Sequence, residues 1–313
     1  MLPENTAFVF PGQGSQSIGM GKSLAERYPA AQEVFAQADD LLGFSLSSLA
    51  WEGPEESLND TINTQPALMV HSVAAIGVLQ ELIPGFQPII VAGHSMGELS
   101  ALVAAAALPF QDALKLVRKR GELMKRAGKL SPGGMAAILG LDIPTLDEIC
   151  AQASAPGEVV QVANDNCPGQ VVISGASAAL ERALPLAREA RARKVVPLAI
   201  SIAAHSPLMN NAQEDFNQAV DAAPIQDPIH PIIGNVNARP MTSAAQIRAD
   251  LQAQLTSRVR WTESIQYMLS QGIKTFVEIG SGSVLTGLIK RIDREVYTLS
   301  LGTPEDFERL LSA

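Results

Sequence analysis

The chain has 313 residues, 47% of them hydrophobic and 18% charged, which is enough to bury a large core in one domain or two. Its formal net charge of −9 argues against general binding of nucleic acid. Two cysteines, Cys150 and Cys167, are too few for a disulfide framework, so we expect free thiols and a cytoplasmic protein. We expect no signal peptide and no membrane association, since no apolar run approaches the ~20 residues that cross a membrane.

Strands and helices alternate over the first 130 residues. The predicted strands are Thr6–Phe10 and 89–92, and the predicted helices are about 17–27, 30–42, Gln65–Leu82 and Phe110–Gly128. The loop Pro11–Gln16, after the first strand, can expose backbone N–H groups. The helix Gln65–Leu82 is apolar nearly all round, which predicts that it is buried.

The sequence Gly93-His94-Ser95-Met96-Gly97 ends the second strand and opens an Ala/Leu-rich helix. In that context the pattern G-x-S-x-G holds its serine in a tight turn, where Gly93 and Gly97 lack the side chains that would clash. The serine hydroxyl is then presented at a helix N-terminus, where free N–H groups can stabilise an oxyanion. The alternative is a strand–helix turn whose serine only caps the helix.

The helix Phe110–Gly128 places one arginine among apolar side chains. At about 100° per residue, Arg120 falls on the face of Ala113, Val117 and Met124, opposite the other cations. An inward-pointing guanidinium is costly unless an anion meets it. The residues alone leave two interpretations open: an internal salt bridge, or a clamp for a substrate carboxylate.

Residues 132–200 follow the order β-α-β-β-α-β, which is typical of a ferredoxin-like domain. Its predicted strands are 134–141, 159–163, 170–174 and 194–200, its helices are 144–153 and 178–193, and a turn-rich loop covers 164–169. Strands at 231–236, 274–279 and 297–300 then alternate with helices near 244–256, 262–271 and 304–311, and a further helix ends at Arg291. The predicted fold class is α/β: a doubly wound, mostly parallel, hydrolase-like sheet from 1–131 and 201–313, with 132–200 inserted as the small domain.

A serine nucleophile needs a base, and the chain has four histidines. His94 adjoins Ser95, so its side chain points elsewhere. His71 belongs to the buried helix, and His230 stands at a strand start with no loop from which to reach a site. His205 ends an apolar run, where α/β folds place functional groups, and is the best candidate base.

Seven motifs occur in a fixed order along nearly the whole chain. They are Phe10-Pro11-Gly12-Gln13-Gly14-Ser15-Gln16, Gly93-His94-Ser95-Met96-Gly97-Glu98, Arg120-Gly121-x-x-Met124, Asn164-x-Asn166-x-Pro168-Gly169-Gln170-Val171-Val172, His205-Ser206-x-Leu208-Met209, Leu251-x-x-Gln254-Leu255 and Glu278-Ile279-Gly280-x-Gly282-x-Val284-Leu285. Each motif alone is weak evidence for a family, but the ordered set of seven is highly specific. It resembles the malonyl-CoA:acyl carrier protein transacylase family, among the acyltransferases of fatty acid and polyketide synthesis.

The resemblance implies a role for each matching residue. Ser95 would be the nucleophile, His205 its base, and Arg120 the partner of the malonyl carboxylate. The backbone N–H groups of Gln13 and Met96 would form the oxyanion hole. The backbone carbonyl of Gln254 would orient the histidine, and Asn164, Asn166 and Ala204 would line the substrate pocket.

The resemblance also implies the reaction and its partners. Malonyl-CoA would acylate Ser95, and the phosphopantetheine thiol of acyl carrier protein would then take the malonyl group. The chemistry requires no metal and no redox cofactor, and we expect a monomer.

Two departures from the family pattern leave the acyl group open. Met96 stands where Leu is more usual in the family, and this replacement nearly conserves the side-chain volume. Ala204 stands before His205, where modular polyketide acyltransferases carry Phe for malonyl or Ser for methylmalonyl. A methylmalonyl or other polyketide extender, or a role as a malonate decarboxylase transferase subunit, therefore stays an alternative.

Two other classes of function fit less well. An α/β-hydrolase esterase shares the motif of Ser95, but it would carry its histidine nearer the C-terminus than His205 and an acidic residue after a late strand. A non-catalytic docking subunit would have no need for an intact serine, histidine and arginine.

Overall fold

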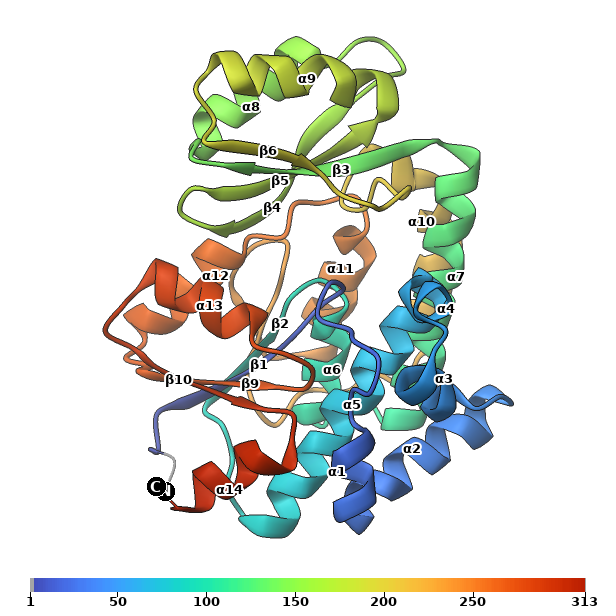
Figure 1. Ribbon diagram of the computed structural model, residues 1–313, viewed down its shortest axis with the longest axis vertical. Helices are drawn as coiled ribbons and strands as arrows, with labels where there is room; N and C mark the ends of the chain where they lie inside the picture. Colours follow the sequence, from blue (N-terminus) through green and yellow to red (C-terminus); the bar gives the residue numbers. More distant parts are fainter. Residues whose placement is uncertain (1–2, 313) are drawn as a thin grey trace.

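The first strand, β1 (Thr6–Phe10), is buried along its whole length and lies near the centre of a six-stranded sheet. In the computed structural model, which describes residues 3–312, this sheet has the order β10-β9-β1-β2-β7-β8 (Figure 1). The other strands are β2 (Ile90–Gly93), β7 (Ile232–Ile233), β8 (Pro240–Met241), β9 (Thr275–Ile279) and β10 (Tyr297–Leu301). Neighbours pair in parallel except β8, which runs antiparallel to β7, so the predicted α/β class with a mostly parallel sheet is confirmed.

Side chains of the sheet enter apolar cores on both faces. Phe8 and Phe10 point into the larger core, which contains α5 (Thr61–Leu82), α6 (Gly97–Ala104) and α7 (Phe110–Leu130). Ala7 and Val9 point the other way, toward α12 (Trp261–Ser270) and α13 (Val284–Ile292). Successive side chains of a strand point to opposite faces, so a sheet covered on both sides needs apolar residues at every position.

Helix α5 begins four residues before its predicted start, because the Asp60 side chain accepts a hydrogen bond from the N–H of Ile62. By length and composition alone α5 could span a membrane, but most of its apolar stretch is buried inside the protein. The remaining helices of this part are α1 (Lys22–Arg27), α2 (Pro29–Leu42), α3 (Leu46–Glu52), α4 (Glu55–Asn59), α10 (Asn210–Ala222), α11 (Ala244–Gln254) and α14 (Pro304–Ser312). The short helices α3 and α4 are not predicted by the sequence pattern.

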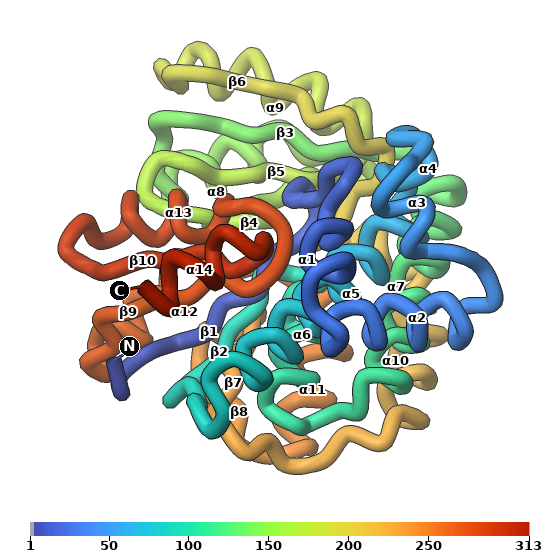
Figure 2. The backbone as a smooth tube through the Cα atoms, turned by 60° about the horizontal axis from the view of Figure 1, so that its bottom comes forward, coloured from blue at the N-terminus to red at the C-terminus, as the bar shows by residue number. Residues whose placement is uncertain are grey.

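A second sheet lies above the first, with the order β4-β5-β3-β6 and every pair antiparallel (Figure 2). Its strands are β3 (Gly133–Leu139), β4 (Val160–Cys167), β5 (Gln170–Ala176) and β6 (Lys194–Pro197). Helices α8 (Ile143–Ala153) and α9 (Ser177–Glu189) cover its outer face, away from the first sheet (Figure 1). The observed order of elements, β-α-β-β-α-β, is the predicted one.

Several strand ends differ from the prediction, and those of β4 and β6 shape the space between the sheets. β4 continues to Cys167 instead of ending at 163, because it keeps pairing with β5 through two register shifts. β6 ends at Pro197 instead of residue 200, after which the chain leaves the small sheet. It crosses back irregularly to a 3₁₀ turn at Pro207–Met209, so His205 lies in a crossing loop and not at the end of a strand.

We predict that Phe276→Ala lowers the free energy of unfolding by about 3–5 kcal/mol, because its fully buried ring fills the core under α12 and α13. Urea denaturation followed by tryptophan fluorescence measures this change. The matched control is Tyr297→Ala on the neighbouring strand β10, where 55% of the residue is exposed and the cost should stay under about 1 kcal/mol. Equal losses in the two variants would contradict this description of the core.

Candidate active site

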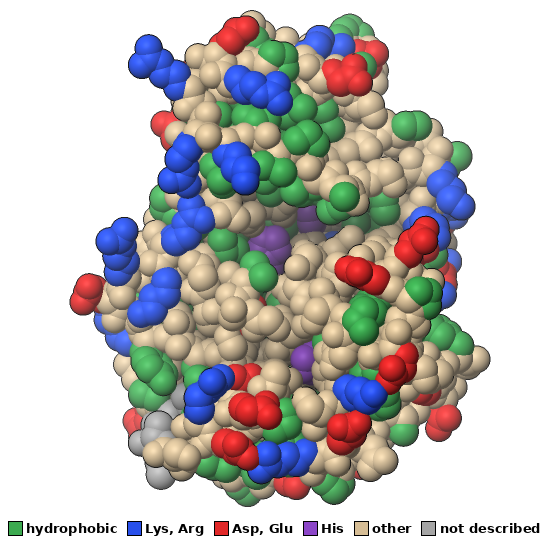
Figure 3. Space-filling model, in the orientation of Figure 1, with side chains coloured by type: hydrophobic (Ala, Val, Ile, Leu, Met, Phe, Trp, Pro, Cys, Tyr) green, Lys and Arg blue, Asp and Glu red, His purple; other side chains and the backbone are tan. Residues whose placement is uncertain are grey.

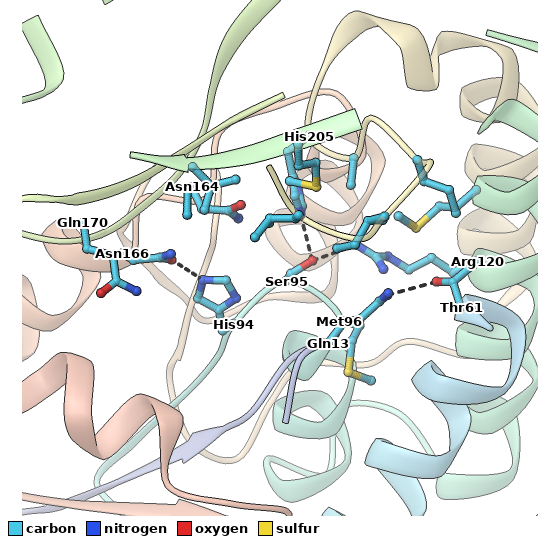
Figure 4. Close-up of a pocket in the computed structure, with 18 residues that line it drawn as sticks. Gln13, Thr61, His94, Ser95, Met96, Arg120, Asn164, Asn166, Gln170 and His205 are labelled. Carbon is cyan, nitrogen blue, oxygen red and sulfur yellow. Dashed lines mark hydrogen bonds between the residues drawn. The ribbon is translucent and has the colours of Figure 1, made fainter. Parts of the chain in front are cut away.

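A cavity of about 260 Å³ lies between the two sheets. Figure 3 shows a hollow at this level, with histidine side chains visible in it. Eight residues singled out from the sequence line it: Gln13, Ser95, Met96, Arg120, Asn164, Asn166, Ala204 and His205 (Figure 4). They come from both parts of the chain, so the cavity exists only where the small sheet sits over the large one.

Ser95 follows β2 in a sharp turn before α6, with φ of +53°, a conformation that is unusual for a residue with a side chain. A Cβ at Gly93 would overlap the backbone of Gly97, and a Cβ at Gly97 would overlap the carbonyl of Phe10. The two glycines therefore allow the strand, the turn and the helix to approach this closely, as the sequence pattern predicts.

The hydroxyl of Ser95 lies 2.7 Å from Nε2 of His205. The other ring nitrogen, Nδ1, faces two backbone carbonyl oxygens, 3.0 Å from that of Gln254 and 3.2 Å from that of Ser257. Carbonyl oxygens only accept hydrogen bonds, so Nδ1 must carry the proton and Nε2 is left as the acceptor for the serine hydroxyl. This tautomer is the one that a general base needs.

His205 is held in place by the chain around it. It is 3% exposed, its φ is +58°, and its backbone carbonyl accepts a hydrogen bond of 2.8 Å from Gln161 of β4. Burial, followed by the positive charge of Arg120, lowers the pKa of His205 to about 3. The imidazole is therefore neutral at physiological pH, with Nε2 free to take a proton.

Arg120 is 1% exposed, yet its guanidinium reaches the cavity. It donates to Oε1 of Gln65 and Oε1 of Gln254, each at 2.8 Å, and to the Ser95 hydroxyl at 3.2 Å. Within residues 3–312 it forms no ion pair, so the internal salt bridge weighed from the sequence is not observed. Burial lowers the pKa of Arg120 to about 10, which leaves it charged beside the serine.

Two backbone N–H groups near Ser95 are free of internal partners. In the described part of the chain, the N–H groups of Gln13 and Met96 donate no hydrogen bond, while the N–H of Ser95 is taken by Asn235 at 2.7 Å. The Gln13 side chain accepts from Thr61 at 3.0 Å, which fixes the loop after β1. Both residues line the cavity, so their N–H groups are available to a ligand oxygen.

Asn164 and Asn166 alternate along β4 and both line the cavity, because residues two apart on a strand share a face. Nε2 of His94 lies 2.8 Å from Oδ1 of Asn166, so His94 points away from Ser95 as predicted. Ala204 belongs to a largely apolar wall, whose other members are Met124, Met135, Leu198, Ile200 and Ile202. No cluster of three or more metal-ligating side chains is found among residues 3–312.

The remaining histidines lie away from the cavity, in keeping with the sequence interpretation. His71 is buried in α5, where its Nε2 lies 2.8 Å from the carbonyl oxygen of Gly302. His230 lies 2.8 Å from Gln87 on the surface.

Sequence reasoning missed several buried polar groups behind the cavity. These are Gln65, Glu98, Asn235, Asp250 and the side chain of Gln254. Glu98 directly follows the serine motif, and Asn235 lies near the end of the strand predicted at 231–236, so their positions offered a signal. Their mutual contacts depend on the tertiary fold.

The chain matches the family model described as "Acyl transferase domain" over residues 7–300. It is 48% identical over 302 residues to the malonyl CoA-acyl carrier protein transacylase of Bacillus subtilis, covering 96% of this chain and 95% of the relative. A solved structure of the malonyl CoA-acyl carrier protein transacylase from Coxiella burnetii is 43% identical, with a TM-score of 0.95 and coverage of 99% and 98%. A malonyl-transacylase solved in complex with a type II PKS acyl-carrier protein is 41% identical, with a TM-score of 0.94 and coverage of 98% and 99%.

We predict that sulfonylation of Ser95 by the uncharged reagent phenylmethylsulfonyl fluoride keeps a level rate from pH 8 down to about pH 5. A base with a pKa of about 3 becomes protonated only below that range, whereas an ordinary histidine would slow the reaction below about pH 6.5. Intact mass against time gives the rate. In Arg120→Gln the falling limb should move to higher pH, because a positive charge that lowers the pKa of His205 is gone. A wild-type midpoint near pH 6.5 would contradict the prediction.

Proposed function

Because the chain belongs to the acyl transferase domain family, we propose that it transfers a malonyl group from malonyl-CoA to the phosphopantetheine thiol of acyl carrier protein. The group travels as an ester of Ser95. The names of relatives at 42–48% identity over 96% of the chain support this reaction.

The observation that carries the proposal is the buried Arg120 beside Ser95 and His205. A charged guanidinium at 1% exposure with only amide and hydroxyl partners lacks the anion that would offset its burial. The carboxylate of a malonyl thioester supplies that anion and places the thioester carbonyl near the serine. An ordinary ester substrate has no such charge, which argues against an α/β-hydrolase esterase.

In the first half-reaction, Ser95 Oγ attacks the thioester carbonyl while its proton passes to Nε2 of His205. The negative charge on the carbonyl oxygen is met by the N–H groups of Gln13 and Met96. The carbonyl of Gln254 steadies the imidazolium through Nδ1–H. The tetrahedral intermediate then expels the CoA sulfur, which takes the proton from His205, and the malonyl-serine ester remains.

The second half-reaction runs through the same groups. The phosphopantetheine thiol gives its proton to His205 and attacks the ester carbonyl. The intermediate expels Ser95 Oγ, which regains a proton from His205. Both half-reactions use only side chains and backbone groups of the protein. Malonyl-CoA takes part as a substrate and not as a cofactor.

A second candidate acyl group follows from Ala204. Its small side chain belongs to an apolar wall of the cavity, which leaves room for an α-methyl group. The alternative to malonyl transfer is therefore transfer of methylmalonyl or another polyketide extender. A further alternative is that the protein is the transferase subunit of a malonate decarboxylase. Asn164 and Asn166 are proposed to contact the substrate from β4.

Residues 132–200 are proposed to be a ferredoxin-like domain inserted into a hydrolase-like domain formed by 1–131 and 201–313. The antiparallel order β4-β5-β3-β6 and the two helices on one face support this division. We further propose a cytoplasmic monomer that binds neither nucleic acid nor membrane, consistent with the net charge of −9 and two buried free thiols.

We predict that Ser95→Ala abolishes both the malonyl adduct and transfer, because the nucleophile is lost. His205→Ala should slow transfer by about 10²–10⁴-fold, as removal of a general base does. Intact mass after incubation with malonyl-CoA reports the adduct, and circular dichroism confirms that the variants fold. A malonyl ester on Ser95→Ala, or a loss below tenfold for His205→Ala, would contradict these roles.

We predict that Arg120→Ala lowers kcat/KM for malonyl-CoA by about 10²-fold, because it removes one partner of a buried charge pair. Reaction with acetyl-CoA should stay level or rise, since that acyl group has no carboxylate. Arg120→Lys should rescue malonyl transfer poorly, because an ammonium lacks the planar fork. Equal losses on the two substrates would show that Arg120 is structural.

A further inference from the structure

A fully buried carboxyl group lies behind the cavity without lining it. Glu98, in the first turn of α6, is 0% exposed, and its Oε2 is approached by two amide side chains. Gln254 donates to Oε2 at 2.8 Å, and Asn235 donates to the same oxygen. A carboxyl group buried this deeply needs such donors, and it also decides which end of each amide faces it.

The Asn235 amide joins Glu98 to the serine turn. Its Nδ2 donates to Glu98 and, at 2.8 Å, to the carbonyl of Gly93. Its Oδ1 is thereby directed to the N–H of Ser95 at 2.7 Å. The backbone N–H of Asn235 donates to Asp250 at 3.2 Å, which fixes the position of Asn235. Asn235 in turn fixes the turn that carries the nucleophile, from the side away from the cavity.

The Gln254 amide joins Glu98 to the arginine. Its Nε2 donates to Glu98 at 2.8 Å and to the backbone carbonyl of Ser95 at 3.2 Å. Its Oε1 is thereby directed to Arg120, at 2.8 Å from Nη2. Reversing this amide would put an NH₂ group against the guanidinium, where two donors would face each other.

We propose that Glu98 is a positioning residue for acyl transfer: as the acceptor for both amides, it aims the Arg120 guanidinium through Gln254 and holds the Ser95 turn through Asn235. This role of Glu98 rests on the proposed malonyl transfer. Burial and the charge of Asp250 raise the pKa of Glu98 well above its ordinary value. A protonated Glu98 keeps Oε2 as an acceptor, so its role does not depend on its charge.

The test compares Glu98→Gln with Glu98→Met. The amide oxygen of Gln can accept from both neighbours, so Glu98→Gln should keep kcat/KM for malonyl-CoA within about threefold. Met fills a similar volume but accepts no strong hydrogen bond, so both amides are free to turn. In Glu98→Met the ratio of kcat/KM for malonyl-CoA to that for acetyl-CoA should fall about tenfold, with KM for malonyl-CoA raised and KM for acetyl-CoA unchanged.

Glu278→Met is the matched control. Glu278 is also 0% exposed, but it accepts from the N–H groups of Leu285 and Thr286 at the start of α13. Its loss should lower the melting temperature without changing the ratio between substrates. If Glu98→Met is not recovered folded, Gln254→Met carries the test, since it removes the relaying amide and keeps the carbonyl that His205 uses.

The outcomes separate this inference from the proposed function. Absence of a malonyl adduct on the wild-type protein would overturn the proposed function itself. A wild-type adduct together with an unchanged substrate ratio in Glu98→Met, or in Gln254→Met, would overturn only the positioning role. Equal impairment of Glu98→Gln and Glu98→Met would also overturn it, because the acceptor oxygen would then not be what matters.

Discussion

The arrangement of the cavity depends on a buried guanidinium, that of Arg120, which contacts no carboxylate in the described part of the chain. Arg120 is offset by amide oxygens of Gln65 and Gln254 and by the hydroxyl of Ser95, all neutral acceptors. These neutral acceptors bind its Nη1 and Nη2 groups without cancelling its charge, while its buried Nε has no partner among residues 3–312. The field of this charge reaches His205, where it adds to burial in lowering the pKa and keeps the base neutral.

The serine and the histidine both occupy backbone conformations that favour glycine, and each needs support from elsewhere in the chain. Ser95 is tethered by Asn235 from the segment after β7, and the carbonyl of His205 is tethered by Gln161 from the small sheet. Strain of this kind persists only where the surroundings fix it. The two sheets therefore contribute unequally: the large sheet carries the nucleophile, and the small one closes the cavity and secures the base.

Gln254 contacts the site through three different atoms. Its backbone carbonyl faces His205, its Oε1 faces Arg120, and its Nε2 faces the Ser95 carbonyl and Glu98. A carbonyl in place of a triad carboxylate orients the imidazole without adding a negative charge. That arrangement places no carboxylate of residues 3–312 in contact with Arg120, whose Nη groups stay available to an anionic acyl group; Glu98 acts on it only from beyond the Gln254 amide.

The sequence by itself determined the strand before and the helix after Gly93–Gly97, the turn that needs both glycines, and the inward direction of Arg120, because these depend on local periodicity and backbone sterics. It also limited the candidate base to His205 by elimination among four histidines. Only the tertiary structure decided what Arg120 contacts, and it contacts no carboxylate. The orientation of the amides of Asn235 and Gln254, and the contact between Ser95 and His205, likewise depend on residues that lie more than 100 positions apart in the chain, which no local pattern records.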